Sequence, residues 1–97
     1  MPKGYWIAHV DVTDPEGYKQ YVALNAKAFA KFKAKFLVRG GQFALKHGKA
    51  RARHVVIEFD SYATAIACYE SPEYREAEVV RNKYSTGDVI VIEGYDG

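Results

Sequence analysis

The stretch from Arg53 to Glu76 constrains the fold more than any other part of the chain. Residues 53–60 alternate between apolar and polar side chains and are rich in β-branched residues, a pattern typical of a strand. The apolar members of this alternation are Val55, Ile57 and Phe59. Ser61 then has the character of an N-cap, and apolar residues follow it at helical spacing. We therefore predict a strand that turns into a helix at Ser61.

A second helix start follows directly. Pro72 disfavours helical geometry at the residue before it but suits the first turn of a new helix, so Ser71 is expected to end one helix and cap the next. We predict that this helix runs from Pro72 to about Tyr84. Its packing stripe is expected to contain Tyr74, Ala77, Val80 or Arg81, and Tyr84.

Composition limits the class of protein. A chain of 97 residues is expected to form one domain, and 48% hydrophobic residues is a generous share for that size. The excess suggests apolar surface buried against a second copy of the chain, since monomers rarely expose large apolar patches. Fourteen basic and twelve acidic residues leave a net charge of only +2, which gives no support for nucleic-acid binding.

Cys68 is the single cysteine, so it cannot form an internal disulfide, and it is interpreted as a buried packing residue in a reducing compartment. No apolar run approaches the roughly 20 residues of a membrane span. We expect a cytoplasmic protein with no membrane partner.

The first strand is predicted at Gly4–Val12, where one face is wholly apolar and the other is mixed. Large apolar groups on both faces indicate a strand that is covered on both sides. His9 lies on the less apolar face. It is either a satisfied interior histidine or a ligand-binding group, because histidine titrates near neutral pH.

A long helix is predicted from Asp14-Pro15-Glu16, which combines a capping acid, a proline at the first position and an acid near the positive end of the helix dipole. Its aromatic face is expected to contain Tyr18, Tyr21, Val22, Phe29, Phe32 and Phe36. The lysines on the other face are interpreted as solvated. Asn25 falls in the middle of the aromatic face, where it is either a polar link in the core or a pocket residue.

Two further strands are predicted. Residues 37–47 form a strand in which Gly40-Gly41 marks a bulge or a close approach, and a solvated basic turn follows at 47–53. The guanidinium of Arg39 can hold a carboxylate in a bidentate manner, so we expect it to pair either with Glu58 on a neighbouring strand or with an acidic ligand. Residues 88–93 form the last strand.

The expected order is β-α-β-β-α-β, with the second helix broken at Pro72. This is the ferredoxin-like pattern, an α+β fold in which a four-stranded antiparallel sheet carries its helices on one face. The opposite face is also apolar at Tyr5, Ile7 and Val56, so two sheets are expected to pack into a dimeric α+β barrel. His9 and Glu58 would then point into the interface between them.

Several short motifs together resemble the DUF1330 family of the dimeric α+β barrel superfamily. They are Asp14-Pro15-Glu16 with Tyr18 and Tyr21, Arg39-Gly40-Gly41, Val56-Ile57-Glu58-Phe59, the run from Tyr69 through Ser71-Pro72-Glu73 to Tyr74, and Arg81. The resemblance covers essentially the whole length and implies a homodimer without a settled activity. Tyr74 and Asn25 are expected to border the same cavity as the polar cluster, because both lie on the inward faces of their helices. Tyr69, Ser71 and Arg81 are further candidate binding residues. Where relatives carry tryptophan before the tyrosine, this chain has Cys68, which implies a differently shaped rim.

Two functions are consistent with these features. The first is a cofactor-independent enzyme acting on a small anionic or aromatic compound between sheet and helices, with Arg39 binding the acid and His9 or Glu58 moving a proton. Relatives elsewhere in the resembled superfamily include cofactor-free monooxygenases, haem-degrading enzymes, isomerases and chlorite dismutases, but none of their catalytic sets carries over to this chain residue by residue. The alternative is small-ligand binding without turnover, or a purely structural homodimer. No nucleotide-binding loop or metal-ligand spacing occurs in the sequence, so no cofactor and no metal are expected.

Overall fold

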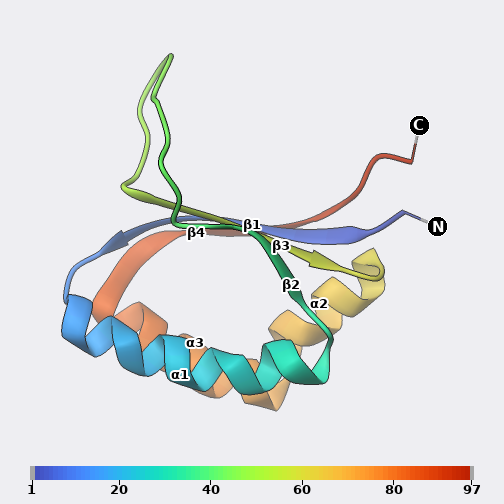
Figure 1. Ribbon diagram of the computed structural model, residues 1–97. Helices are drawn as coiled ribbons and strands as arrows, with labels where there is room; N and C mark the ends of the chain where they lie inside the picture. The colour runs from blue at the N-terminus through green and yellow to red at the C-terminus, as the bar shows by residue number, and fades with distance from the viewer. Residues whose placement is uncertain (1, 97) are drawn as a thin grey trace.

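The computed structural model describes residues 2–96 and has the order β-α-β-β-α-α-β. The strands are β1 (Gly4–Val12), β2 (Lys35–Arg39), β3 (Arg53–Phe59) and β4 (Ser85–Glu93); the helices are α1 (Pro15–Lys31), α2 (Tyr62–Glu70) and α3 (Pro72–Tyr84). The strands form one antiparallel sheet in the order β2-β3-β1-β4, and the helices cover one of its faces (Figure 1). The predicted ferredoxin-like α+β fold is confirmed.

The alternation predicted for the two central strands places their apolar residues under the helices. Trp6 on β1 pairs with Ile57 on β3, and both side chains are at most 3% exposed. The same alternation sends the neighbours of these residues, including His9 and Glu58, to the face that the helices leave open. We call that second face the open face of the sheet.

Three local capping signals were predicted correctly. Asp14 accepts a hydrogen bond from the Gly17 amide at 3.3 Å, and Ser61 accepts one from the Thr64 amide at 3.1 Å. Ser71 ends α2 and begins α3: its hydroxyl donates to the Cys68 carbonyl at 2.7 Å and accepts from the Tyr74 amide at 3.2 Å. Local hydrogen bonds of this kind fix helix ends regardless of what packs around them.

Helix α1 is shorter than the aromatic spacing suggested. It ends at Lys31 because the chain reverses there: Lys33 adopts a left-handed φ of 57°, and the Ala34 amide bonds back to the Phe29 carbonyl at 2.9 Å. Phe36 therefore lies on β2 instead of on the helix. It still contacts Phe29, with ring centroids 5.4 Å apart, so the helical pattern predicted its burial but not its secondary structure.

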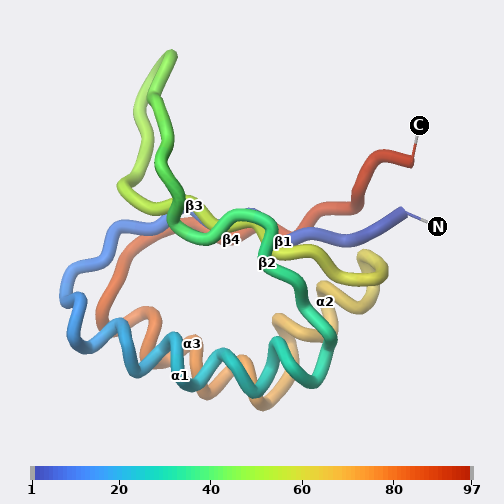
Figure 2. The backbone as a smooth tube through the Cα atoms, in the orientation of Figure 1, coloured from blue at the N-terminus to red at the C-terminus, as the bar shows by residue number. Residues whose placement is uncertain are grey.

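The second strand is also shorter than predicted, and its bulge lies elsewhere. Strand β2 covers only Lys35–Arg39, and its pairing with β3 shifts by one residue between Phe36 and Val38, ahead of the Gly40-Gly41 pair. Gly40 has φ 68° and turns the chain out of the sheet. Residues 40–52 then form a projecting loop, the arm, which rises on the side away from the helices (Figures 1 and 2).

Cys68 is fully buried, as predicted, and burial raises the pKa of its thiol to about 12, with the charge of Glu73 adding to the effect. The thiol therefore acts as a packing group at neutral pH. None of the helices in the described part of the chain is long and apolar enough to span a bilayer.

Replacing Ser71 by alanine should lower the free energy of unfolding by about 1–2 kcal/mol, because both hydrogen bonds of this buried hydroxyl are lost at the junction of two helices. Urea denaturation measures the change. Ser61→Ala is the matched control, since Ser61 caps only one helix and is less buried. A smaller loss for Ser71→Ala than for Ser61→Ala would contradict this account of the junction.

Candidate functional site

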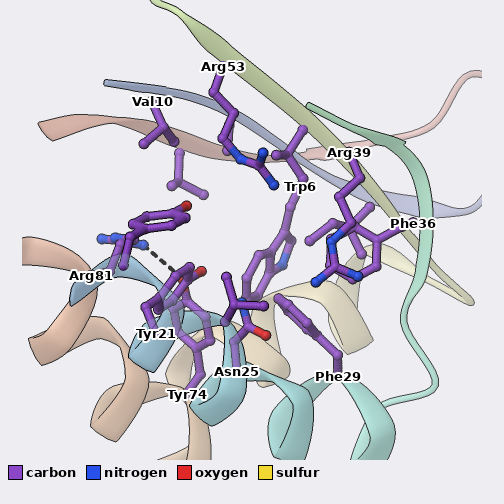
Figure 3. Close-up of a pocket in the computed structure, with 16 residues that line it drawn as sticks. Trp6, Val10, Tyr21, Asn25, Phe29, Phe36, Arg39, Arg53, Tyr74 and Arg81 are labelled. Carbon is purple, nitrogen blue, oxygen red and sulfur yellow. Dashed lines mark hydrogen bonds between the residues drawn. The ribbon is translucent and has the colours of Figure 1, made fainter. Parts of the chain in front are cut away.

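A cavity lies between the helix-covered face of the sheet and helices α1 and α3 (Figure 3). The empty space between the lining atoms, including the part open to solvent at the mouth, is about 470 Å³. The region in which the centre of a water-sized group fits is about 40 Å³. One water needs roughly 10–15 Å³ by this measure, so the cavity as it stands has room for only a few small groups. Its lining is mostly apolar and aromatic, with tyrosine hydroxyls, one amide and three guanidinium groups.

The indole of Trp6 forms one wall of the cavity and ties the sheet to the helices. Its Nε1 donates a hydrogen bond to the Ala65 carbonyl of α2 at 2.8 Å. Its ring meets Phe29 of α1 and Tyr74 of α3 edge-on, with centroids 5.3 Å and 4.8 Å away. This wall is therefore fixed by both packing and a buried hydrogen bond.

A hydrogen-bonded chain of hydroxyls lies at the α3 side of the cavity. The hydroxyls of Tyr21 and Tyr74 are 2.7 Å apart, and Arg81 Nη1 donates to the Tyr74 oxygen at 2.8 Å. Arg81 Nη2 donates to the Tyr69 oxygen at 3.2 Å, and Tyr69 donates to Glu78 at 2.6 Å. Arg81 also lies 3.4 Å from Glu78, which compensates its charge.

The hydroxyl pair has one proton to spare. Two hydroxyls carry two protons, and the bond between Tyr21 and Tyr74 uses only one of them. Burial, and then the neighbouring Tyr21, raise the pKa of Tyr74, with the nearby Arg81 offsetting part of the effect. Burial therefore favours the protonated form of Tyr74, and the two hydroxyls together carry one proton that their mutual bond does not use.

Arg39 and Arg53 bring positive charge to the cavity without a carboxylate partner among the described residues. The Arg39 guanidinium stacks over the Phe36 ring, with its central carbon 4.0 Å from the ring centroid. Arg39 is exposed overall, so its side chain lies at the rim of the cavity. Arg53 is half-buried and its Nε is buried without a hydrogen-bond acceptor. The backbone of Gly40 passes so close to the Arg53 guanidinium that a Cβ at Gly40 would collide with it.

The side-chain amide of Asn25 borders the cavity from α1 (Figure 3). The residue is only 5% exposed, and no hydrogen bond joins its side chain to another described residue. Buried amides normally have partners, so an unpaired one facing a cavity requires an explanation. Of the two interpretations that the sequence left open for Asn25, its position matches that of a pocket residue.

Among the residues that line the cavity there is no histidine, aspartate or glutamate. His9 and Glu58 lie on the open face, as the alternation of their strands predicted, but they do not line the cavity in which they were expected to move a proton. The Nδ1 atoms of His9 and His54 are 2.8 Å apart, and Glu58 accepts only a 3.5 Å contact from the Tyr5 hydroxyl. The prediction that these two residues share a pocket with Arg39 and Asn25 was therefore wrong, because strand alternation separates them.

The expected pair between Arg39 and Glu58 is not formed either. The residue opposite Glu58 is Lys35, while Arg39 pairs with Val55. The shift between Phe36 and Val38 moves Arg39 to the parity of Val55, and hence to the helix-covered face, where it meets the cavity. The alternative that Arg39 serves an acidic ligand stays a prediction.

Of the other predicted site residues, some line the cavity and others only hold neighbouring residues in place. Tyr74 and Arg81 line the cavity, whereas Tyr69 stands behind Arg81 and orients it. Ser71 is occupied by its two capping bonds. Sequence reasoning did not single out Arg53, although the alternation of β3 places it on the same face as Val55.

The substitution Glu58→Gln should change the free energy of unfolding by no more than about 1 kcal/mol, because Glu58 makes no ion pair with another described residue and its one contact, with Tyr5, is 3.5 Å long. Chemical denaturation tests this. A loss of about 3–5 kcal/mol would show a buried ion pair at this position and would restore the original prediction.

Several solved structures share this fold at low sequence identity. A protein of unknown function from Rhodopseudomonas palustris superposes with a TM-score of 0.73 at 18% identity, covering 99% of this chain and 85% of that one. The cofactor-independent oxygenase SnoaB from Streptomyces nogalater has a TM-score of 0.64 at 12% identity, with 100% and 97% coverage. A dimeric ferredoxin-like protein of unknown function from Thermobifida fusca has a TM-score of 0.61 at 19% identity, with 95% and 89% coverage.

Sequence comparison identifies the family. No curated protein gives a significant match to the sequence. The family model for DUF1330, a domain of unknown function, matches residues 3–95, which is nearly the whole chain. This protein belongs to the DUF1330 family.

Proposed function

We propose that this protein binds a small organic anion in the cavity between the sheet and helices α1 and α3. The observation that carries the proposal is the pair Arg39 and Arg53, two guanidinium groups without carboxylate partners at an otherwise largely apolar cavity. Guanidinium groups bind carboxylates through paired, charge-assisted hydrogen bonds. A carboxylate lying between these two side chains would compensate their charge and supply an acceptor to the buried Arg53 Nε.

The other residues that line the cavity indicate the chemistry and size of the rest of the ligand. Beyond the arginines the cavity wall is formed mainly by aromatic and aliphatic groups, with Trp6, Tyr21 and Tyr74 among the largest. The enclosed space is small, so an aromatic acid would enter only if a rim residue moved. Arg39, exposed and stacked on Phe36, is the side chain free to do so. We therefore infer a compact ligand with a single aromatic ring or an apolar body of similar size.

A cofactor-independent enzyme is the second candidate. The hydroxyl pair of Tyr21 and Tyr74, backed by Arg81, offers a proton donor to a bound molecule. The same fold carries a cofactor-independent oxygenase in SnoaB. Since the described lining has no carboxylate or imidazole to act as a base, such an enzyme would need a substrate that is already ionised or ionises readily. Turnover of a bound compound would separate the enzyme from a binding protein.

We also propose that the protein is a homodimer formed through the open face of the sheet. Adjacent strands place a block of apolar side chains there, made up of Tyr5, Ile7, Val56, Ile90 and Ile92. Ile90 and Ile92 are 51% and 45% exposed in the single chain. An apolar patch of this kind favours association with a second copy. The Thermobifida fusca neighbour is itself described as dimeric.

Replacing Arg53 by methionine should weaken benzoate binding about tenfold or more, since a charge-assisted hydrogen bond to a buried guanidinium contributes roughly 1.5–3 kcal/mol. Isothermal titration calorimetry measures the affinity. Arg75→Met is the matched control, because Arg75 is an exposed arginine on α3 and does not line the cavity. Equal losses in both variants would point to general electrostatics and against this site.

The substitution Ile90→Lys should convert the dimer into a monomer, because it places a charge in the centre of the apolar block. Multi-angle light scattering at low micromolar concentration reports the mass. Val79→Lys is the control, since Val79 is an exposed apolar residue on α3, away from the open face of the sheet. A monomeric wild-type protein, or a dimeric Ile90→Lys variant, would refute this interface.

A further inference from the structure

Asn25 and the hydroxyl pair of Tyr21 and Tyr74 form a second polar position in the cavity, separate from the arginines. All three residues are at most 7% exposed, and Asn25 and Tyr21 project from successive turns of α1. Figure 3 shows them on the helix side of the cavity, facing Arg39 and Arg53 on the sheet side. The cavity thus has a cationic side and a neutral hydrogen-bonding side.

The neutral side has unused hydrogen-bonding capacity. The amide of Asn25 has no protein partner among the described residues, and the hydroxyl pair retains one proton beyond its mutual bond. Arg81 donates to the Tyr74 oxygen, which polarises that hydroxyl and strengthens the donor that the pair presents. An unpaired amide and a spare hydroxyl proton on successive turns of one helix are suited to an oxygen acceptor, either a carbonyl or an ionised hydroxyl.

We infer that the ligand is an anion with two polar ends: a carboxylate held by Arg39 and Arg53, and a carbonyl-type oxygen at the other end of its apolar body held by Asn25 and Tyr21. This inference rests on the proposed function and adds a substrate class to it. The ligand class is an oxo-substituted, predominantly apolar carboxylic acid. An acid with a purely hydrocarbon body would leave the amide and the free hydroxyl proton unsatisfied, and such sites discriminate strongly against ligands that lack the matching polar group.

Two nearly isosteric ligands test the inference: para-acetylbenzoate, which carries the carbonyl oxygen, and para-isopropenylbenzoate, in which a methylene group replaces it. We expect the wild-type protein to bind the acetyl compound about tenfold more tightly by calorimetry, the size of effect that a satisfied buried hydrogen bond gives. Asn25→Leu and Tyr21→Phe should each reduce this preference to about threefold or less.

The outcomes separate the two proposals. If the isopropenyl compound binds the wild-type protein and the acetyl compound binds no better, the second polar position is refuted while anion binding stands. A preference that persists in both variants also refutes it. If neither compound binds, the proposed function itself fails.

Thermal denaturation verifies that the variants are folded. We expect a higher melting temperature for Asn25→Leu, because an unpaired buried amide is replaced by an apolar side chain.

Discussion

The side chain of Trp6 joins the two layers of this protein, and the position of the cavity depends on it. From a central strand, one indole contacts Phe29 on α1 and Tyr74 on α3 and donates a hydrogen bond to α2. A large aromatic group that packs and also satisfies its N–H can fix several elements at once. The helices are thereby held at a fixed separation from the sheet, and the cavity occupies the space beside this contact.

Two of the polar groups that border the cavity have no protein partner among the described residues. Asn25 lacks a protein partner, and the buried Nε of Arg53 lacks an acceptor. Unpaired buried groups of this kind cost free energy in a folded chain. Helix caps are in place and apolar residues lie under the helices, although His54 Nε2 and Glu73 Oε1, away from the cavity, are also buried without a partner among the described residues. An amide and a guanidinium that lack protein partners at the same cavity are typical of a functional site.

One irregular position decides the chemistry of that cavity. The register shift between Phe36 and Val38 moves Arg39 from the open face to the helix-covered face. In a regular strand Arg39 would lie on the same face as Glu58, and the two charges could neutralise each other. The irregularity keeps them apart, so the positive charge of Arg39 remains uncompensated beside Arg53.

Local signals in the sequence determined much of the architecture. The alternation of the central strands, the caps at Asp14, Ser61 and Ser71, and the proline that restarts the last helix depend only on neighbouring residues, which explains why they were predicted correctly. The residues that meet in the cavity were decided by the tertiary structure. Arg39, for example, lies at the cavity because of a register shift that has no local sequence signal. The chain reversal that ends α1 before Phe36 has no such signal either. Register depends on pairing between distant segments, so a pattern read along one segment can predict which side chains are buried but not which of them share a site.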